Sequence, residues 1–199
     1  MNVSLAMWSV LFRYKLGELR RAYLAARESS QKERAAIEKR WQELEAAVAA
    51  GTAAFTEEDE DGYVVVDWGE QAGEALSENE GMQRVYREAF LISLFHFWER
   101  ELLRRMKKED VKDNQAFAFL KAKGLAPAES KLTALRLAAN VAKHSEGKSA
   151  EKLFKIRPDL FDVEAMKNWN SKPGHEHLLI TDEALDDFFD AVRMSGPGK

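Results

Sequence analysis

One nine-residue segment of the chain gathers side chains that could bind an anion and move a proton. It reads RLAANVAKH and contains Arg136, Asn140, Lys143 and His144. On a helix, at about 100° per residue, these four side chains share an arc of about 100°. Arginine offers a fork of donors to phosphate, lysine a point charge, and histidine a proton carrier near neutral pH. The pattern favours a phosphodiester-binding site, and a solvated helix face is the alternative.

The elements that would position these groups are helices. Apolar residues fill the rest of this segment and SEGKS follows it, so we predict a helix over Glu129–His144 that begins after Pro127. The strongest helical pattern covers Met82–Lys108, and its part between Phe90 and Trp98 is apolar nearly all round, which indicates a central buried helix. A narrow polar stripe crosses it at Ser93, His96, Arg100, Arg104 and Lys107.

The remaining segments give an all-α prediction. Residues 3–27 and 31–50 both have helical spacing of apolar residues, and we expect them to form an antiparallel hairpin. We expect a short helix over Asp110–Lys123 and a last helix capped by Thr181.

The segment 57–80 differs from the rest because it holds ten acidic residues and no basic one. We predict a solvated acidic loop there, and the alternative is an acidic mimic of nucleic acid that shields a basic site. The predicted organisation is a helical hairpin packed on the bundle (1–56), the acidic loop (57–80), a helical core (81–194) and a flexible tail (195–199).

Two segments in the predicted core resemble the HEPN superfamily (higher eukaryotes and prokaryotes nucleotide-binding). FLISLFHFWERELL (90–103) is followed some thirty residues later by LRLAANVAKHSEG (135–147), and LLITDEALDDFF (178–189) is similar to the return of the family into its final helix. The family pattern is matched by Leu135, Arg136, Asn140, His144 and Gly147, and its glutamate by Glu99. The likeness covers about residues 84–192 and implies a HEPN-like helical bundle.

The resemblance also implies an activity, that of a metal-independent RNA endonuclease in a toxin–antitoxin or phage-defence system. His144 would act as general acid or base, Arg136 or Lys143 would stabilise charge on the phosphorane, and Asn140 would orient the histidine or the phosphate. Further phosphate contacts are expected from Arg100, Arg104 and Lys148, with supporting roles for Glu99, Ser93 and His96. The implied partners are RNA or a nucleotide, a second copy in a homodimer, and a protein antitoxin.

Ala139 departs from the family pattern, because it stands directly before Asn140, where the family carries its catalytic arginine. Either Arg136 or Lys143 substitutes for that arginine, or the protein is a catalytically inactive module that binds nucleotide, RNA or a protein partner. A helical assembly scaffold is a third interpretation.

Composition limits the other classes. The chain has 199 residues, 45% of them hydrophobic, and a formal net charge of −4, so it can form a core and is not basic overall. Residues 84–157, however, carry a net charge of +8, which favours a local anionic ligand. The absence of cysteine excludes disulfides, a thiol nucleophile and zinc sites that need sulfur.

No cofactor is expected, because P-loop, dinucleotide-binding, hydrolase-elbow and zincin motifs are missing from the sequence. His175 and His177 could hold a metal only with a further ligand, and we expect no metal site. The apolar N-terminal stretch ends at Arg13, short of the roughly 20 residues of a membrane span. We therefore expect no membrane association and a cytoplasmic protein.

Overall fold

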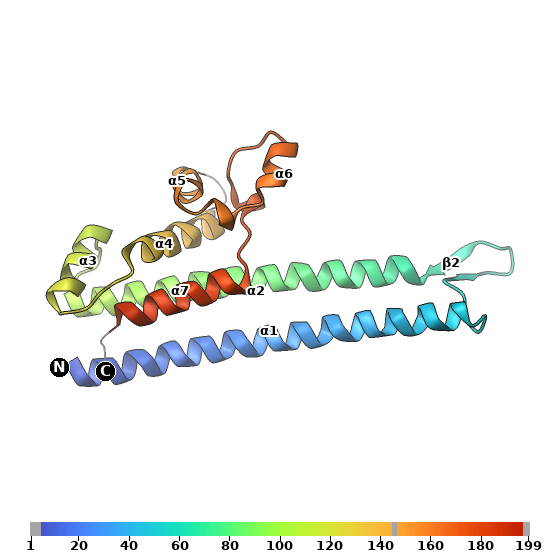
Figure 1. The fold of residues 1–199 in the computed structure, drawn as a ribbon, viewed down its shortest axis with the longest axis horizontal. Helices are drawn as coiled ribbons and strands as arrows, with labels where there is room; N and C mark the ends of the chain where they lie inside the picture. The colour runs from blue at the N-terminus through green and yellow to red at the C-terminus, as the bar shows by residue number, and fades with distance from the viewer. Residues whose placement is uncertain (1–4, 145–146, 197–199) are drawn as a thin grey trace. The chain divides into compact units, whose positions relative to one another are not determined.

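The computed structural model describes residues 5–144 and 147–196, and most of these residues are helical (Figure 1). They form seven α-helices, a small antiparallel sheet and two short 3-10 helices. The all-α prediction is confirmed. The elements in chain order are α1 (Leu5–Ala49), β1 (Thr56–Glu58), β2 (Val64–Asp67), α2 (Trp68–Met106), α3 (Asp113–Ala122), α4 (Glu129–His144), α5 (Lys148–Ile156), η1 (Pro158–Leu160), α6 (Val163–Asn168), η2 (His175–His177) and α7 (Asp182–Ser195).

The chain divides into two compact units. Unit 1 comprises Met1–Tyr23 and Arg87–Lys199, and unit 2 comprises Leu24–Tyr86. Helices α1 and α2 each contribute one part to unit 1 and the other part to unit 2.

Unit 1 has an extensive apolar core. The centre of α2 supplies Leu91, Leu94 and Trp98, as its all-round apolar pattern predicts. Helix α4 packs against α7 and α5. The other large contributions to this core are Phe12 and Tyr23 of α1, Leu132 and Leu135 of α4, and Leu185, Phe188, Phe189 and Val192 of α7.

Helix α7 is fixed at both of its ends. The hydroxyl of Thr181 accepts a hydrogen bond from the backbone N–H of Ala184 at 3.1 Å, as the predicted cap requires. At the other end, the buried Ser195 hydroxyl accepts from the indole N–H of Trp98 at 2.9 Å. Ser195 therefore belongs to α7, and the prediction of a tail from 195 is wrong at this residue; the tail residues 197–199 lie outside the described residues.

Unit 2 is a pair of helical segments joined by a β-hairpin. The strands β1 and β2 pair antiparallel, with Thr56 opposite Asp67. Helix α1 ends at Ala49, and a turn follows it. Gly51 in this turn has a φ of 71°, which suits glycine, and Thr52 donates its N–H to the carbonyl of Ala47. Helix α2 begins directly after β2, because the carboxylate of Asp67 accepts from the N–H groups of Gly69 and Glu70.

A buried polar pair lies between the two helical segments of unit 2. Asn79 of α2 donates its amide N–H to the carbonyl of Ser30 of α1 at 3.1 Å, and the Ser30 hydroxyl donates to the amide oxygen of Asn79 at 3.3 Å. Gln83 donates to the same amide oxygen at 2.9 Å. Since a paired asparagine inside a helical seam is costly to displace, these bonds fix the register of the two segments.

Two parts of the predicted organisation are wrong. Residues 3–50 do not form a hairpin, because α1 continues from Leu5 to Ala49 without a break at residues 28–30. The segment 57–80 is not a loop, because it contains both part of the β-hairpin and the first 13 residues of α2, from Trp68. The acidic residues there are compatible with a helix, since carboxylates near its N-terminus interact favourably with the helix dipole.

None of the described helices has the length and apolar content that crossing a lipid bilayer requires.

Candidate nucleic-acid interface at the end of helix α4

The carboxyl end of α4 and the start of α5 enclose a small open pocket in unit 1. Its volume is about 210 Å³, and the described residues that line it are Asn140, Val141, His144, Gly147, Lys148, Ser149 and Ala150. Asn140 and His144 lie one turn apart on α4, and both reach the pocket as their spacing predicts. Lys148, which the sequence also suggested, comes from the first turn of α5.

Gly147 makes the sharp entry into α5. Its φ of 131° is strained for any residue that carries a side chain, and among the described residues no side chain caps α5 at this N-cap position. The first N–H groups of a helix have no acceptor within the helix, and they carry the positive end of its dipole. The pocket therefore combines an exposed imidazole, an amide, an ammonium group and a helix N-terminus, which together suit an anion such as phosphate. Glu151 lies in the same turn but does not line the pocket.

Arg136 does not reach this pocket. Its guanidinium donates to both carboxylate oxygens of Asp113, from Nε at 2.9 and 3.0 Å and from Nη2 at 2.8 Å. Asp113 begins α3, so this bidentate pair ties α3 to α4. Arg136 and His144 are eight positions apart, which also separates them by a helical rise of about 12 Å. The expectation that all four polar groups of α4 converge is wrong.

Lys143 also turns away from the pocket lining. Its ammonium lies 5.6 Å from the centre of the Phe95 ring, a cation–π contact with α2. The ring of His96 is 5.5 Å from the same phenyl ring, so Lys143 and the polar stripe of α2 meet at Phe95. The other residues of the stripe that were predicted to bind or support, Ser93, Arg100 and Arg104, are exposed.

Glu99 and His96 interact with each other. Glu99 Oε2 lies 3.3 Å from His96 Nδ1 one turn away, and both side chains are substantially exposed. The buried carboxylate of this helix is Glu101, which accepts from Lys15 Nζ at 3.0 Å. Sequence reasoning missed Glu101, although it follows Phe97 and Trp98 by four and three residues, and this spacing is a signal that its side chain shares their buried face.

Ala139 is fully buried in the unit 1 core. The position that carries an arginine in the family pattern therefore faces packed side chains here, not the pocket. An arginine at this position could not share the pocket with His144 unless α4 turned about its axis.

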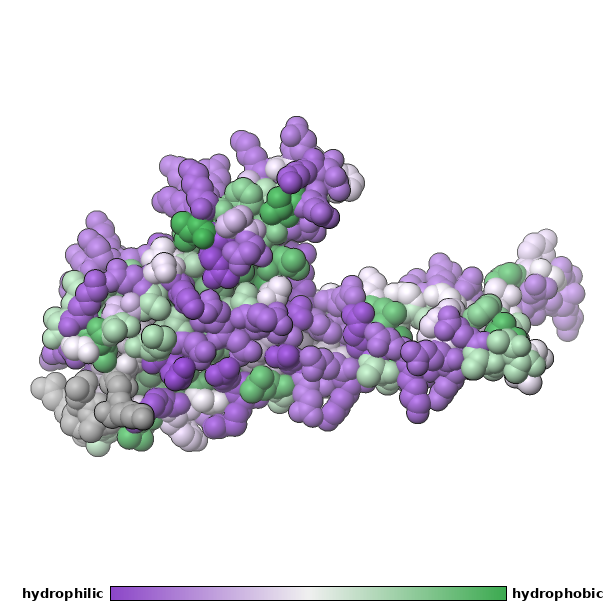
Figure 2. All heavy atoms as spheres, in the orientation of Figure 1, coloured by the Kyte–Doolittle hydropathy of each residue, from purple (hydrophilic) through white to green (hydrophobic). Residues whose placement is uncertain are grey.

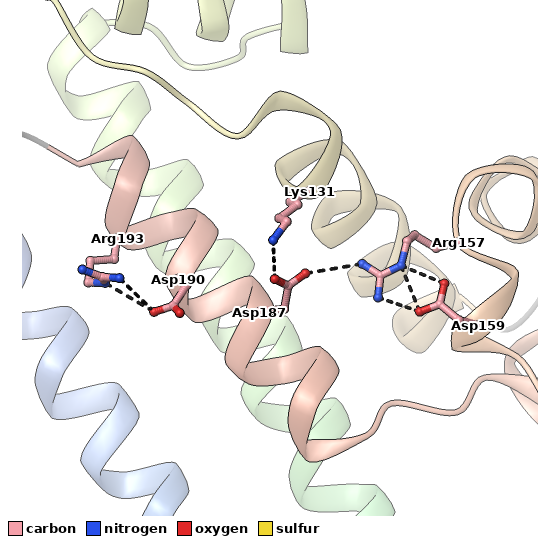
Figure 3. A network of polar contacts seen from close by, with 6 residues as sticks. All are labelled: Lys131, Arg157, Asp159, Asp187, Asp190 and Arg193. Atoms are coloured by element: carbon pink, nitrogen blue, oxygen red, sulfur yellow. Dashed lines mark hydrogen bonds and ion pairs between the residues drawn. The ribbon is translucent and has the colours of Figure 1, made fainter.

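Helix α5 is held against α4 and α7 by the network drawn in Figure 3. Arg157, at the end of α5, donates to both oxygens of Asp159 at 2.7 to 3.0 Å and lies 3.7 Å from the carboxylate of Asp187. Asp187 of α7 also pairs with Lys131 of α4. The hydrogen bonds from Arg157 lower the pKa of the Asp159 carboxyl. These contacts hold the carboxyl end of α5 against α7.

The two histidines of GHEHLL bind other partners. His175 Nε2 lies 2.8 Å from Glu88 Oε2, and His177 Nε2 lies 2.6 Å from the Ser171 hydroxyl. No cluster of three or more His, Asp or Glu side chains suited to a metal ion occurs in residues 5–144 and 147–196. His175–His177 form the 3-10 helix η2, and the extended residue Leu178 that follows makes an isolated antiparallel bridge with Phe161.

Comparisons with protein-family models, with curated proteins and with solved structures find no match for this chain.

Proposed function

We propose that this protein is a HEPN-like RNA-binding protein, and that one RNA phosphate binds in the pocket at the end of α4. The observation that carries the proposal is the joint lining of one open pocket by Asn140, His144 and Lys148. These groups can donate hydrogen bonds to phosphate oxygens, and Lys148 adds a positive charge. The net charge of +8 over residues 84–157 supports an anionic ligand.

Binding is better supported than cleavage. Transesterification at the ribose 2′-hydroxyl develops charge on the phosphorane, and a guanidinium is the group best suited to stabilise it. The guanidinium of Arg136 is bound by Asp113, and Lys143 contacts Phe95. Metal-independent RNA cleavage is the second candidate function, and it is favoured by the exposed imidazole of His144 beside Lys148 in the pocket. A second copy of the chain would then have to supply the missing cation.

The proposal is tested with the full-length protein and a fluorescein-labelled single-stranded RNA, by anisotropy at several salt concentrations. Lys148→Ala should weaken binding about three- to tenfold and reduce the salt dependence by about one phosphate contact. Lys152→Ala is the matched control, because Lys152 is an exposed lysine of the same helix that does not line the pocket. His144→Ala should also weaken binding.

The same RNA, analysed on a denaturing gel, separates the two functions. Products that form with the wild type and not with His144→Ala would establish cleavage, and bound but intact RNA would establish a binding module. Equal affinities for Lys148→Ala, His144→Ala and Lys152→Ala would refute the pocket as the binding site, and so would an absence of RNA binding by the wild type at low salt.

A further inference from the structure

Unit 2 has almost no buried side chains. Every residue from Leu24 to Tyr86 is described, and no apolar side chain among them is buried; the buried ones are Ser30 and Asn79. Apolar residues of this unit are instead half-buried or exposed, including Phe55, Tyr63, Val65 and Trp68. Figure 2 shows hydrophobic surface around the end of unit 2 that carries β2. A pair of helices with a small hairpin lacks the second layer that normally closes a core.

An apolar groove runs between the two helical segments of this unit. Its volume is about 430 Å³, and we call it the unit 2 groove. It is lined by Ile37, Arg40, Trp41 and Leu44 of α1 and by Trp68, Gln71, Ala72 and Ala75 of α2. The apolar positions recur at intervals of four and three residues on both helices, which is the spacing of a seam that receives a further helix.

The shape of the groove follows from its small and large residues. Ala72 and Ala75 leave space on α2, whereas Trp41 fills the other wall and stacks on Phe55 with ring centres 5.5 Å apart. Large aromatic walls opposite small residues form a groove suited to apolar anchors of a partner helix.

The net charge of unit 2 indicates which kind of partner fits the unit 2 groove. Unit 2 contains 15 acidic and 6 basic residues, a net charge of −9. On the α2 side of the groove the nearby charged residues are Glu70 and Glu74, with Asp67 of β2 just before them, and all are acidic. Arg40 of α1 is the charged residue of the lining itself, and it is outnumbered by the acidic residues of the unit. Two copies of this face would repel each other, and the same charge disfavours nucleic acid and anionic lipid surfaces. A helix with an apolar stripe between lysines or arginines complements both the apolar lining of the groove and the negative charge of unit 2.

We propose that the unit 2 groove binds a basic amphipathic helix of a partner protein. The apolar stripe of that helix fills the groove against Trp41, Ala72 and Ala75, and its basic residues pair with the acidic flanks. This binding site is separate from the RNA pocket of unit 1, so either proposal can fail without the other.

The probe is a synthetic helical peptide of about three heptads, with leucine at the a and d positions and lysine at the flanking positions. A matched peptide carries glutamate in place of every lysine. Binding of each labelled peptide to the full-length protein is measured by fluorescence anisotropy. We expect the lysine peptide to bind at least about tenfold more tightly than the glutamate peptide, and its affinity to fall as salt rises.

Two protein variants locate the binding site. Ala72→Lys places a long cationic side chain in the groove and should weaken binding of the lysine peptide at least about tenfold, because it blocks the seam and repels the peptide. Ala46→Lys makes the same substitution at an exposed position of α1 that does not line the groove, and should leave the affinity within about twofold. Circular dichroism checks that both variants keep the helical content of the wild type.

Three outcomes would overturn the proposal. They are equal affinities of the two peptides, equal affinities of the two variants for the lysine peptide, and the absence of lysine-peptide binding. Sedimentation of the wild type and of both variants provides a fourth outcome. If the wild type and the Ala46→Lys variant are dimers and the Ala72→Lys variant is a monomer, the occupant of the groove is a second copy of the chain.

Discussion

The polar residues of α4 have different partners although they share one face of the helix. Arg136 is bound by Asp113 at the start of α3, Lys143 contacts Phe95 of α2, and Asn140 and His144 line the pocket beside α5. A carboxylate that accepts two guanidinium hydrogen bonds neutralises most of the field of that guanidinium. The cation nearest to an anion in the pocket is therefore Lys148 and not Arg136.

The buried position of Ala139 leads to a prediction about restoring the family pattern. Ala139→Arg should lower the free energy of unfolding by about 3 kcal/mol or more, because it overpacks the core and buries an unpaired charge. Asn140→Arg should cost much less, since Asn140 is only half-buried and lines an open pocket. Urea unfolding of both variants measures the difference. Wild-type stability of Ala139→Arg would contradict the placement of residue 139 in the core.

The sequence was sufficient to predict part of this site. The four-residue spacing of Asn140 and His144 predicted that they share one face of a helix. Gly147, three residues after His144, is placed where a turn into the next helix can form. It did not indicate the partner of Arg136, because Asp113 lies 23 residues away and resembles any acidic residue at the start of a helix. Partner choice among surface charges depends on tertiary packing, which residue spacing does not encode.

At the scale of elements, the entry into α5 determines whether its N-terminus points at the pocket. Gly147→Ala should lower the free energy of unfolding by about 1 to 3 kcal/mol, because alanine is strained at a φ of 131°. It should also weaken RNA binding, since the start of α5 would move away from His144.

Gly73→Ala is the control for that substitution. Gly73 is an exposed residue inside α2 with open space where a Cβ would lie, so alanine should raise the free energy of unfolding by about 0.5 to 1 kcal/mol. Thermal unfolding of both variants measures the two effects, which have opposite signs. If both variants lost stability, strain at the φ of residue 147 would not explain the loss in Gly147→Ala.

The contact between Arg157 and Asp159 makes the attachment of α5 sensitive to acid. The hydrogen bonds from Arg157 lower the pKa of Asp159 from its ordinary value of 3.8. A lowered carboxyl pKa contributes stability above the ordinary value, and this contribution is lost as the pH falls through the folded-state pKa. Wild type should therefore be more stable than Asp159→Asn near neutral pH, and the difference should shrink below about pH 4. Urea unfolding across this pH range tests it, and a constant difference would contradict it.

The predictability of the elements depended on how clearly they are bounded. Helix α4 matches its predicted bounds because Pro127 and the polar SEGKS segment delimit an amphipathic pattern. Polar residues near position 29 suggested a break in α1, yet none of them is a strong helix breaker. The start of α2 was missed because its acidic composition hid the seam of Trp68, Ala72 and Ala75.

At the scale of the whole molecule, the two units differ in how their chains are stabilised. Unit 1 has a continuous apolar core, whereas unit 2 depends on half-buried residues and the hydrogen bonds of Asn79. Backbone amides of unit 2 should therefore exchange with solvent faster than those of unit 1. Raising the salt from about 20 mM to about 500 mM should slow exchange more in unit 2, because salt screens repulsion within a net charge of −9.

Hydrogen exchange followed by mass spectrometry measures both effects on the full-length protein. Equal exchange in the two units would indicate that unit 2 has a source of stability other than the contacts described, and a salt effect confined to unit 1 would contradict the role of charge repulsion.

The hydrogen bonds between Ser30 and Asn79 have a consequence for how this chain can diverge. They set the alignment of α1 with α2 at a point well before the β-hairpin, so the hairpin is not needed to set it. Insertions, deletions and sequence drift should accordingly accumulate between residues 52 and 66 in relatives of this protein, while the serine and the asparagine change together or not at all.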